Sequence, residues 1–99
     1  MKLLHFVDTA GTDERFVAGA KIKQIAVTAA VTVIVYMDSL DPSVTNNDRV
    51  ELTVDSGFAD EVALTLAQFI AADKNDVLTV EKGVTNFEKV TAVAYSAGA

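Results

Sequence analysis

The clearest pattern in this chain is a helical one. Between residues 58 and 72 hydrophobic side chains recur every three or four positions, so that at 3.6 residues per turn they form one stripe. The members of the stripe are Phe58, Val62, Leu66, Phe69 and Ile70, and Asp60, Glu61 and Gln68 fall on the opposite side. The pattern predicts an amphipathic helix over 58–72, with Ser56 as its N-cap. Because a lone helix has no second helix to pack on, we expect the stripe to lie on a β-sheet.

The remaining hydrophobic segments have the spacing and composition of strands. We predict strands at 3–7, 22–28, 31–37, 49–55, 77–81 and 87–95, which are rich in β-branched residues and separated by turn-forming residues. Phe16 and Val17 are either an anchor that docks on the sheet or the start of a bent strand. Ala29 and Ala30 either turn a hairpin or form a bulge within one long strand, because they lack the Asn-Gly signature of a tight turn.

Two of these strands indicate where the core lies. Segment 31–37 is largely apolar on both faces, which favours a central strand covered on two sides. Segment 49–55 alternates cleanly, with Val50, Leu52 and Val54 directed inward. We therefore predict an α+β fold in one domain spanning 1–99, mostly antiparallel, with the order β-β-β-β-α-β-β. The strands form either a strongly bent sheet or a small, partly open barrel, covered by the helix at 58–72.

Composition and charge exclude several functions. The 99 residues carry 14 acidic and 8 basic side chains, a formal net charge of −6, with no basic run, so we expect no binding to nucleic acid. The chain contains no cysteine, which excludes disulfides and thiolate chemistry. No apolar run is long enough for a membrane helix. We expect a soluble protein, intracellular in its host or part of a virion, with no membrane partner.

Few residues suggest chemistry. His5 is the only histidine, and it lies in an apolar run where a structural role is favoured over a catalytic one that would need partners. The loop at 38–48 is rich in Asp and Asn, but it lacks the ligand spacing of an EF-hand and is better explained by turn formation. The sequence therefore predicts no catalytic residue, no cofactor and no metal site.

Some hydrophobic residues point to assembly. Leu64 breaks the helical pattern, since it projects on the side of Asp60 and Gln68. The last strand is uncharged beyond Lys89, whereas exposed edge strands usually carry protective charge. We expect that strand to be interior or paired with a neighbouring chain. Leu64, Val93 and Tyr95 are accordingly the candidate protein-interface residues of a homo-oligomer.

The strand patterns also resemble known proteins. The segments IAVTAAVTVIVYMDS, DRVELTV, DVLTVEKG and VTAVAYSAG, together with the helix, are similar to small uncharacterised proteins of marine bacteriophages, including those of cyanobacteria. This resemblance implies a virion-associated or structural role, with other virion proteins as partners. The chain also resembles a small Sm-like barrel, although its helix comes late and the Sm RNA-binding motifs are missing, so RNA binding is not carried over.

From these observations we expect a non-enzymatic structural or assembly protein that forms a homo-oligomer. The alternative is a small binding module that engages a peptide or protein partner through an exposed strand edge.

Overall fold

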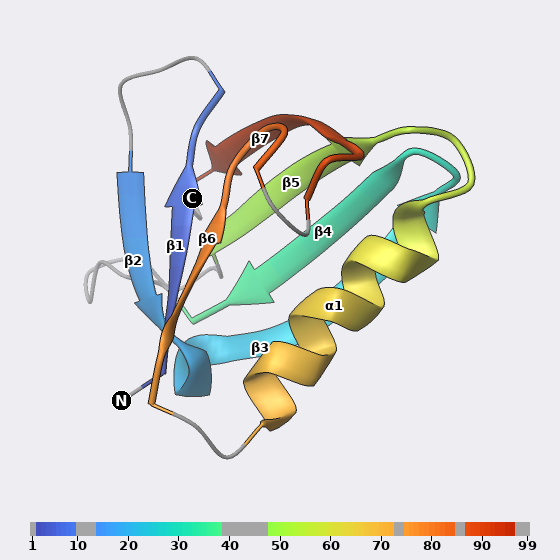
Figure 1. Cartoon of the computed structure of the whole chain (residues 1–99). Helices are drawn as coiled ribbons and strands as arrows, with labels where there is room; N and C mark the ends of the chain where they lie inside the picture. The colour runs from blue at the N-terminus through green and yellow to red at the C-terminus, as the bar shows by residue number, and fades with distance from the viewer. Residues whose placement is uncertain (1, 10–13, 39–47, 73–74, 85–86, 97–99) are drawn as a thin grey trace.

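The computed structural model describes residues 2–9, 14–38, 48–72, 75–84 and 87–96. Within these ranges the chain forms seven strands, one α-helix and one short 3₁₀ turn, η1 (Gly19–Lys21). The strands form two sheets with no closed barrel, and Figure 1 shows the helix lying across one of them. The predicted α+β class, mostly antiparallel and with one helix, is confirmed.

The smaller sheet has three strands in the order β2-β1-β6. Its central strand β1 (Leu3–Val7) is antiparallel to β2 (Glu14–Ala18) and parallel to β6 (Val77–Val80). In β1, Leu4 and Phe6 are buried while the alternate residues are half-buried on the opposite face. The strand β2 places a fifth strand before the helix, where the predicted order had four. Of the two interpretations of Phe16 and Val17, the strand is correct.

The larger sheet has four strands in the order β3-β4-β5-β7. These are β3 (Ile22–Ala29), β4 (Thr32–Met37), β5 (Asp48–Val54) and β7 (Val90–Ser96), and each neighbouring pair is antiparallel. The inward residues predicted for β5 are all buried, as the alternation required. The interior position predicted for β4 is confirmed, but only one of its faces is fully buried. β3 and β4 form a hairpin through Ala30 and Val31, and β3 also has an irregularity between Val27 and Ala29.

The helix α1 (Ala59–Ala71) has the predicted phase. Val62 and Leu66 are buried, Phe69 and Ile70 pack against the core, and Gln68 is exposed. The predicted N-cap is wrong, because α1 starts after Phe58 without a side-chain cap. The preceding residues form a turn in which the Phe58 amide donates to the Asp55 carbonyl at 3.1 Å. That turn needs a positive φ at Gly57, where φ is 89°. Ser56 therefore belongs to the turn and does not cap the helix.

The C-terminus of α1 is closed by a residue distant in sequence. Lys2 Nζ donates to the carbonyl of Ile70 at 2.5 Å and also to the carbonyl of Ala72. A cation satisfies the free carbonyls and the negative end of the helix dipole.

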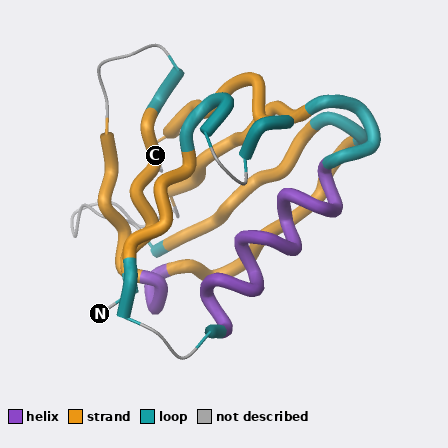
Figure 2. The backbone as a smooth tube through the Cα atoms, viewed as in Figure 1, coloured by secondary structure: helices purple, strands orange, loops and turns teal. Residues whose placement is uncertain are grey.

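The core lies between the inner faces of the two sheets and α1 (Figures 1 and 2). Its largest fully buried side chains are Phe6, Phe87, Leu4, Met37, Leu52 and Leu66. The helix contacts chiefly β3 and β4, and the three-stranded sheet closes the other end. Aliphatic residues supply most of the buried area, as expected from a composition that is 51% hydrophobic and 7% aromatic.

The strand β7 lies at one end of its sheet, yet its outer edge is partly covered. The Thr9 amide donates to the Val93 carbonyl at 2.9 Å, and the Val93 amide donates to Thr9 Oγ1 at 2.6 Å. The Tyr95 amide donates to Asp8 Oδ2 at 3.3 Å. The interior position expected for this strand is therefore wrong, because β7 ends the order of its sheet and residues following β1 cover part of its edge within the same chain. Pairing with a neighbouring chain stays a prediction.

A register shift in β7 also changes which of its residues face the core. Val54 pairs with Val90 but Thr53 pairs with Ala92, so one extra residue is accommodated in β7. Val90 and Val93 are both buried as a result, although strict alternation places them on opposite faces. The sequence pattern missed this because a bulge leaves no signal in a run of small and β-branched residues.

Candidate functional site

The outer face of the three-stranded sheet is the most unusual surface in the described part of the chain. The pairing register places Phe16 of β2 and Thr79 of β6 on either side of His5 in β1. Residues paired across neighbouring strands point to the same face. The side chains on this face are Leu3, His5, Val7, Glu14, Phe16, Ala18, Val77 and Thr79. We call this set the Phe16 face.

Two large apolar residues of the Phe16 face are open to solvent. Phe16 is 60% exposed and Val77 is 48% exposed, while Leu3, Val7 and Ala18 are half-buried. The opposite face of the same sheet carries Leu4, Phe6 and Val80, which are buried. Among the described residues the sheet thus carries apolar side chains on both faces and is covered on only one, an arrangement more typical of a surface that receives a partner than of a solvated sheet.

His5 sits at the centre of this face with three partners. Its ring stacks on Phe16 with the centroids 4.1 Å apart and the planes within 3°. Nε2 lies 2.7 Å from Glu14 Oε1, and Nδ1 lies 3.2 Å from Thr79 Oγ1. Because an ionised carboxylate can only accept, the proton resides on Nε2, and in the neutral ring the Thr79 hydroxyl donates to Nδ1.

Thr79, His5 and Glu14 supply a hydroxyl, a base and a carboxylate, which is the composition of a nucleophilic catalytic set. A nucleophile also needs donors that stabilise a developing oxyanion nearby. The three residues come from three neighbouring strands of one sheet, and Phe16 covers one face of the imidazole. The geometry therefore favours a structural role, in which His5 ties together three strands distant in sequence.

The three predicted interface residues have different environments. Leu64 is 57% exposed on the outer side of α1. Val93 is 2% exposed and belongs to the core, so no partner reaches its side chain in this fold. The prediction of Val93 as an interface residue is therefore wrong, because the bulge in β7 directs its side chain into the core.

Tyr95 is half-buried and engaged within the chain. Its hydroxyl donates to Asp48 Oδ2 at 2.6 Å, and the Arg15 guanidinium lies 4.3 Å from the centre of its ring. Asp48 is the buried charged residue of the core region, with 2% exposure, and Arg15 comes from the other sheet. The cluster of Arg15, Tyr95 and Asp48 thus links the two sheets, and the place of Tyr95 in an interface stays a prediction.

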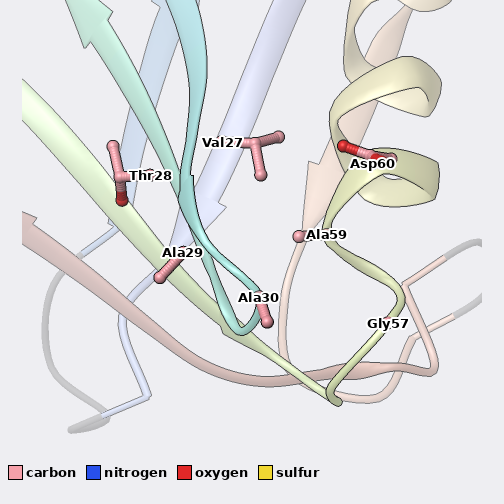
Figure 3. Close-up of a pocket in the computed structure, with 7 residues that line it drawn as sticks. All are labelled: Val27, Thr28, Ala29, Ala30, Gly57, Ala59 and Asp60. Atoms are coloured by element: carbon pink, nitrogen blue, oxygen red, sulfur yellow. The ribbon is translucent and has the colours of Figure 1, made fainter.

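A hollow lies at the other end of the molecule, between the end of β3 and the start of α1. It has a volume of about 410 Å³ and is lined by Val27, Thr28, Ala29, Ala30, Gly57, Ala59 and Asp60. Figure 3 shows the Val27 side chain pointing toward α1, with Ala59 facing it from the first turn of the helix. Most of the lining residues are small, so this end of the layer between sheet and helix is incompletely filled.

Most of the 38–48 loop lies outside the described residues; at its ends, Asp38 forms an ion pair with Lys23 at 3.6 Å and Asp48 binds Tyr95. In the portion of the chain that the structure describes, no group of three or more His, Cys, Asp or Glu side chains is placed to hold a metal ion. None of the helices in that portion is long and apolar enough to cross a membrane.

Comparison with protein-family models, with curated proteins and with solved structures found no match to this chain. The function is therefore argued from the surfaces above. Sequence reasoning missed the Phe16 face because its members come from three separate segments. The available signal was Phe16 itself, an aromatic residue between two charged residues and a buried valine.

Proposed function

We propose that this protein is a non-enzymatic structural subunit that forms a homo-oligomer through the Phe16 face. The observation that carries the proposal is the exposure of Phe16 and Val77, 60% and 48%, on the uncovered side of a sheet whose other side is buried. Burying one such side chain contributes about 1.5–3 kcal/mol. Two copies of the face stacked on each other would bury both aromatic rings and complete a sheet-on-sheet layer.

The resemblance to small marine bacteriophage proteins supports a place for such an oligomer in a virion or in its assembly. Virion subunits bind other copies of themselves and other virion proteins through extended surfaces, which needs exposed apolar area and no reaction chemistry. The acidic net charge of −6 disfavours nucleic acid as the partner. The proposed location is the host cell interior during assembly, or the particle.

A second candidate function is a binding module that engages a peptide through a strand edge. One observation favours it specifically. β3 ends the order of the four-stranded sheet, and no described strand pairs with its outer edge. An open edge of this kind is the element that strand-addition domains use to hold an extended segment.

Light scattering coupled to size-exclusion chromatography tests the proposed assembly with Phe16→Ser. The native chain is expected to elute as an oligomer of the 10.5 kDa subunit at about 100 µM, and the variant as a species of lower mass. Leu64→Ser is the matched comparison, because Leu64 is 57% exposed on a different surface. Its mass should equal that of the native oligomer.

Two results would contradict the proposal. A native chain of 10.5 kDa throughout the accessible concentration range would exclude self-association. Loss of mass in Leu64→Ser but not in Phe16→Ser would place the contact on α1 instead of the Phe16 face.

A further inference from the structure

The layer between the four-stranded sheet and α1 is not closed at one end. Val27 pairs with Val33, so both point to the inner face, and Val33 is fully buried. Val27 is nonetheless 43% exposed. The helix residues drawn beside it in Figure 3 are Ala59 and Asp60, and they leave its side chain partly open to solvent. The hollow thus has an apolar floor that none of the described residues fully covers.

β3 is a terminal strand of its sheet, and no other strand among the described residues pairs with its outer edge. Its last residues, Thr28 and Ala29, line the hollow together with Ala30 of the following turn and with Gly57. An extended peptide that enters here can form main-chain hydrogen bonds with β3 while one of its side chains rests on Val27.

The charge around the hollow selects the kind of segment. Asp60 is the charged residue that lines it, and this side chain is exposed. The whole chain carries a net charge of −6. Opposite charge at the rim of an interface accelerates encounter and fixes the register of the bound segment. A free carboxyl terminus or an acidic motif would be repelled, whereas Lys or Arg beside an apolar residue would be complementary.

We propose that the groove between β3 and α1 binds an extended, basic segment of a partner protein. The segment adds a short strand to the end of β3, places one apolar side chain over Val27 and directs a Lys or Arg side chain at Asp60. This inference specifies the second candidate function and does not depend on self-association through the Phe16 face, which lies on the other sheet. The two proposals can therefore fail independently.

Amide chemical-shift mapping of the full chain tests the groove with defined peptides. The probes are acetyl-Lys-Thr-X-Thr-Lys-amide, with X as Ala, Val, Leu, Phe or Asp, titrated at about 0.15 M salt so that distant charges are screened. Saturable shifts are expected at Val27–Ala30 and Gly57–Asp60, strongest for X as Val or Leu and weakest for X as Asp. The absence of saturable shifts for every peptide, or shifts centred on β2 or β6, would overturn the proposal.

Two variants separate specific binding from general attraction of a basic peptide to an acidic protein. Asp60→Lys should lower the affinity for the peptide with X as Val by about fivefold or more, because an ion pair at the rim of the site becomes a repulsion. Glu51→Lys makes the same change of charge at an exposed position on β5 and should alter affinity by less than about twofold. Equal losses in the two variants would mean nonspecific attraction and would contradict the proposal.

The third variant, Val27→Thr, keeps the shape and strand preference of the residue but replaces one of its two methyl groups with a hydroxyl. It should lower the affinity for the peptide with X as Val by about threefold, while the amide spectrum of the free protein stays otherwise native. Unchanged affinity would exclude Val27 as the floor of the site.

Discussion

At the scale of single residues, the side chains that join the two sheets are the ones that sequence patterns describe least well. Arg15, Tyr95 and Asp48 belong to three separate strands and meet only because β2 and β7 come together in the fold. The same holds for Lys2, which closes the end of α1, and for Glu14 and Thr79 on His5. Polar residues of this kind have no periodicity, so their partners are set by tertiary structure alone.

The Tyr95 hydroxyl gives a direct test of that cluster. Tyr95→Phe removes the 2.6 Å hydrogen bond to Asp48, a carboxylate that is 2% exposed. Loss of a donor to a buried charge costs about 1–3 kcal/mol, which chemical denaturation would show as a lower midpoint with an unchanged slope. Tyr36→Phe is the control, since Tyr36 is half-buried on the outer face of β4, and it should change stability by under about 0.5 kcal/mol. Equal effects would mean that the hydroxyl bond is not what holds the sheets together.

At the scale of elements, regular hydrophobic periodicity predicts the observed helix and strands well, whereas segments that interrupt the periodicity are predicted poorly. The stripe of Val62, Leu66 and its neighbours predicted α1 to within a residue at each end, and the alternation in β5 predicted its buried face. The sequence does not decide between a strand and a docking anchor at Phe16 and Val17, because the larger residue, Phe16, is exposed and the smaller one, Val17, is buried. The bulge in β7 and the parallel pairing of β1 with β6 were beyond reach, since both depend on contacts between distant segments.

Two leucines of α1 test the helical phase that organises this element. Leu66 is fully buried, so Leu66→Ala should destabilise the fold by about 2–5 kcal/mol through lost burial and the cavity left behind. Leu64 is 57% exposed, and Leu64→Ala should cost under about 1 kcal/mol. Both are compared by denaturant midpoints at low protein concentration, where association does not contribute. Similar midpoints for the two variants would contradict the packing of α1.

At the scale of the whole molecule, apolar surface and net charge oppose each other. The Phe16 face favours contact between copies, whereas each copy carries a net charge of −6 and repels the next. Added salt weakens the repulsion between the charged copies, because the Debye length falls from roughly 20 Å at about 20 mM salt to below about 6 Å at about 300 mM. The apolar attraction stays nearly unchanged. Self-association through an apolar face should therefore strengthen as salt is added.

Sedimentation equilibrium across that salt range measures this balance. We expect the dissociation constant of the native oligomer to fall several-fold between low and high salt, and the thermal midpoint to rise with protein concentration, because association stabilises only the folded chain. Phe16→Ser should show neither dependence, since it keeps the charge and loses the aromatic contact. If association of the native chain instead weakens with salt, ionic contacts hold the copies together. The contact would then lie on a charged surface such as the rim of α1, because the Phe16 face offers only Glu14 and His5 for ion pairing.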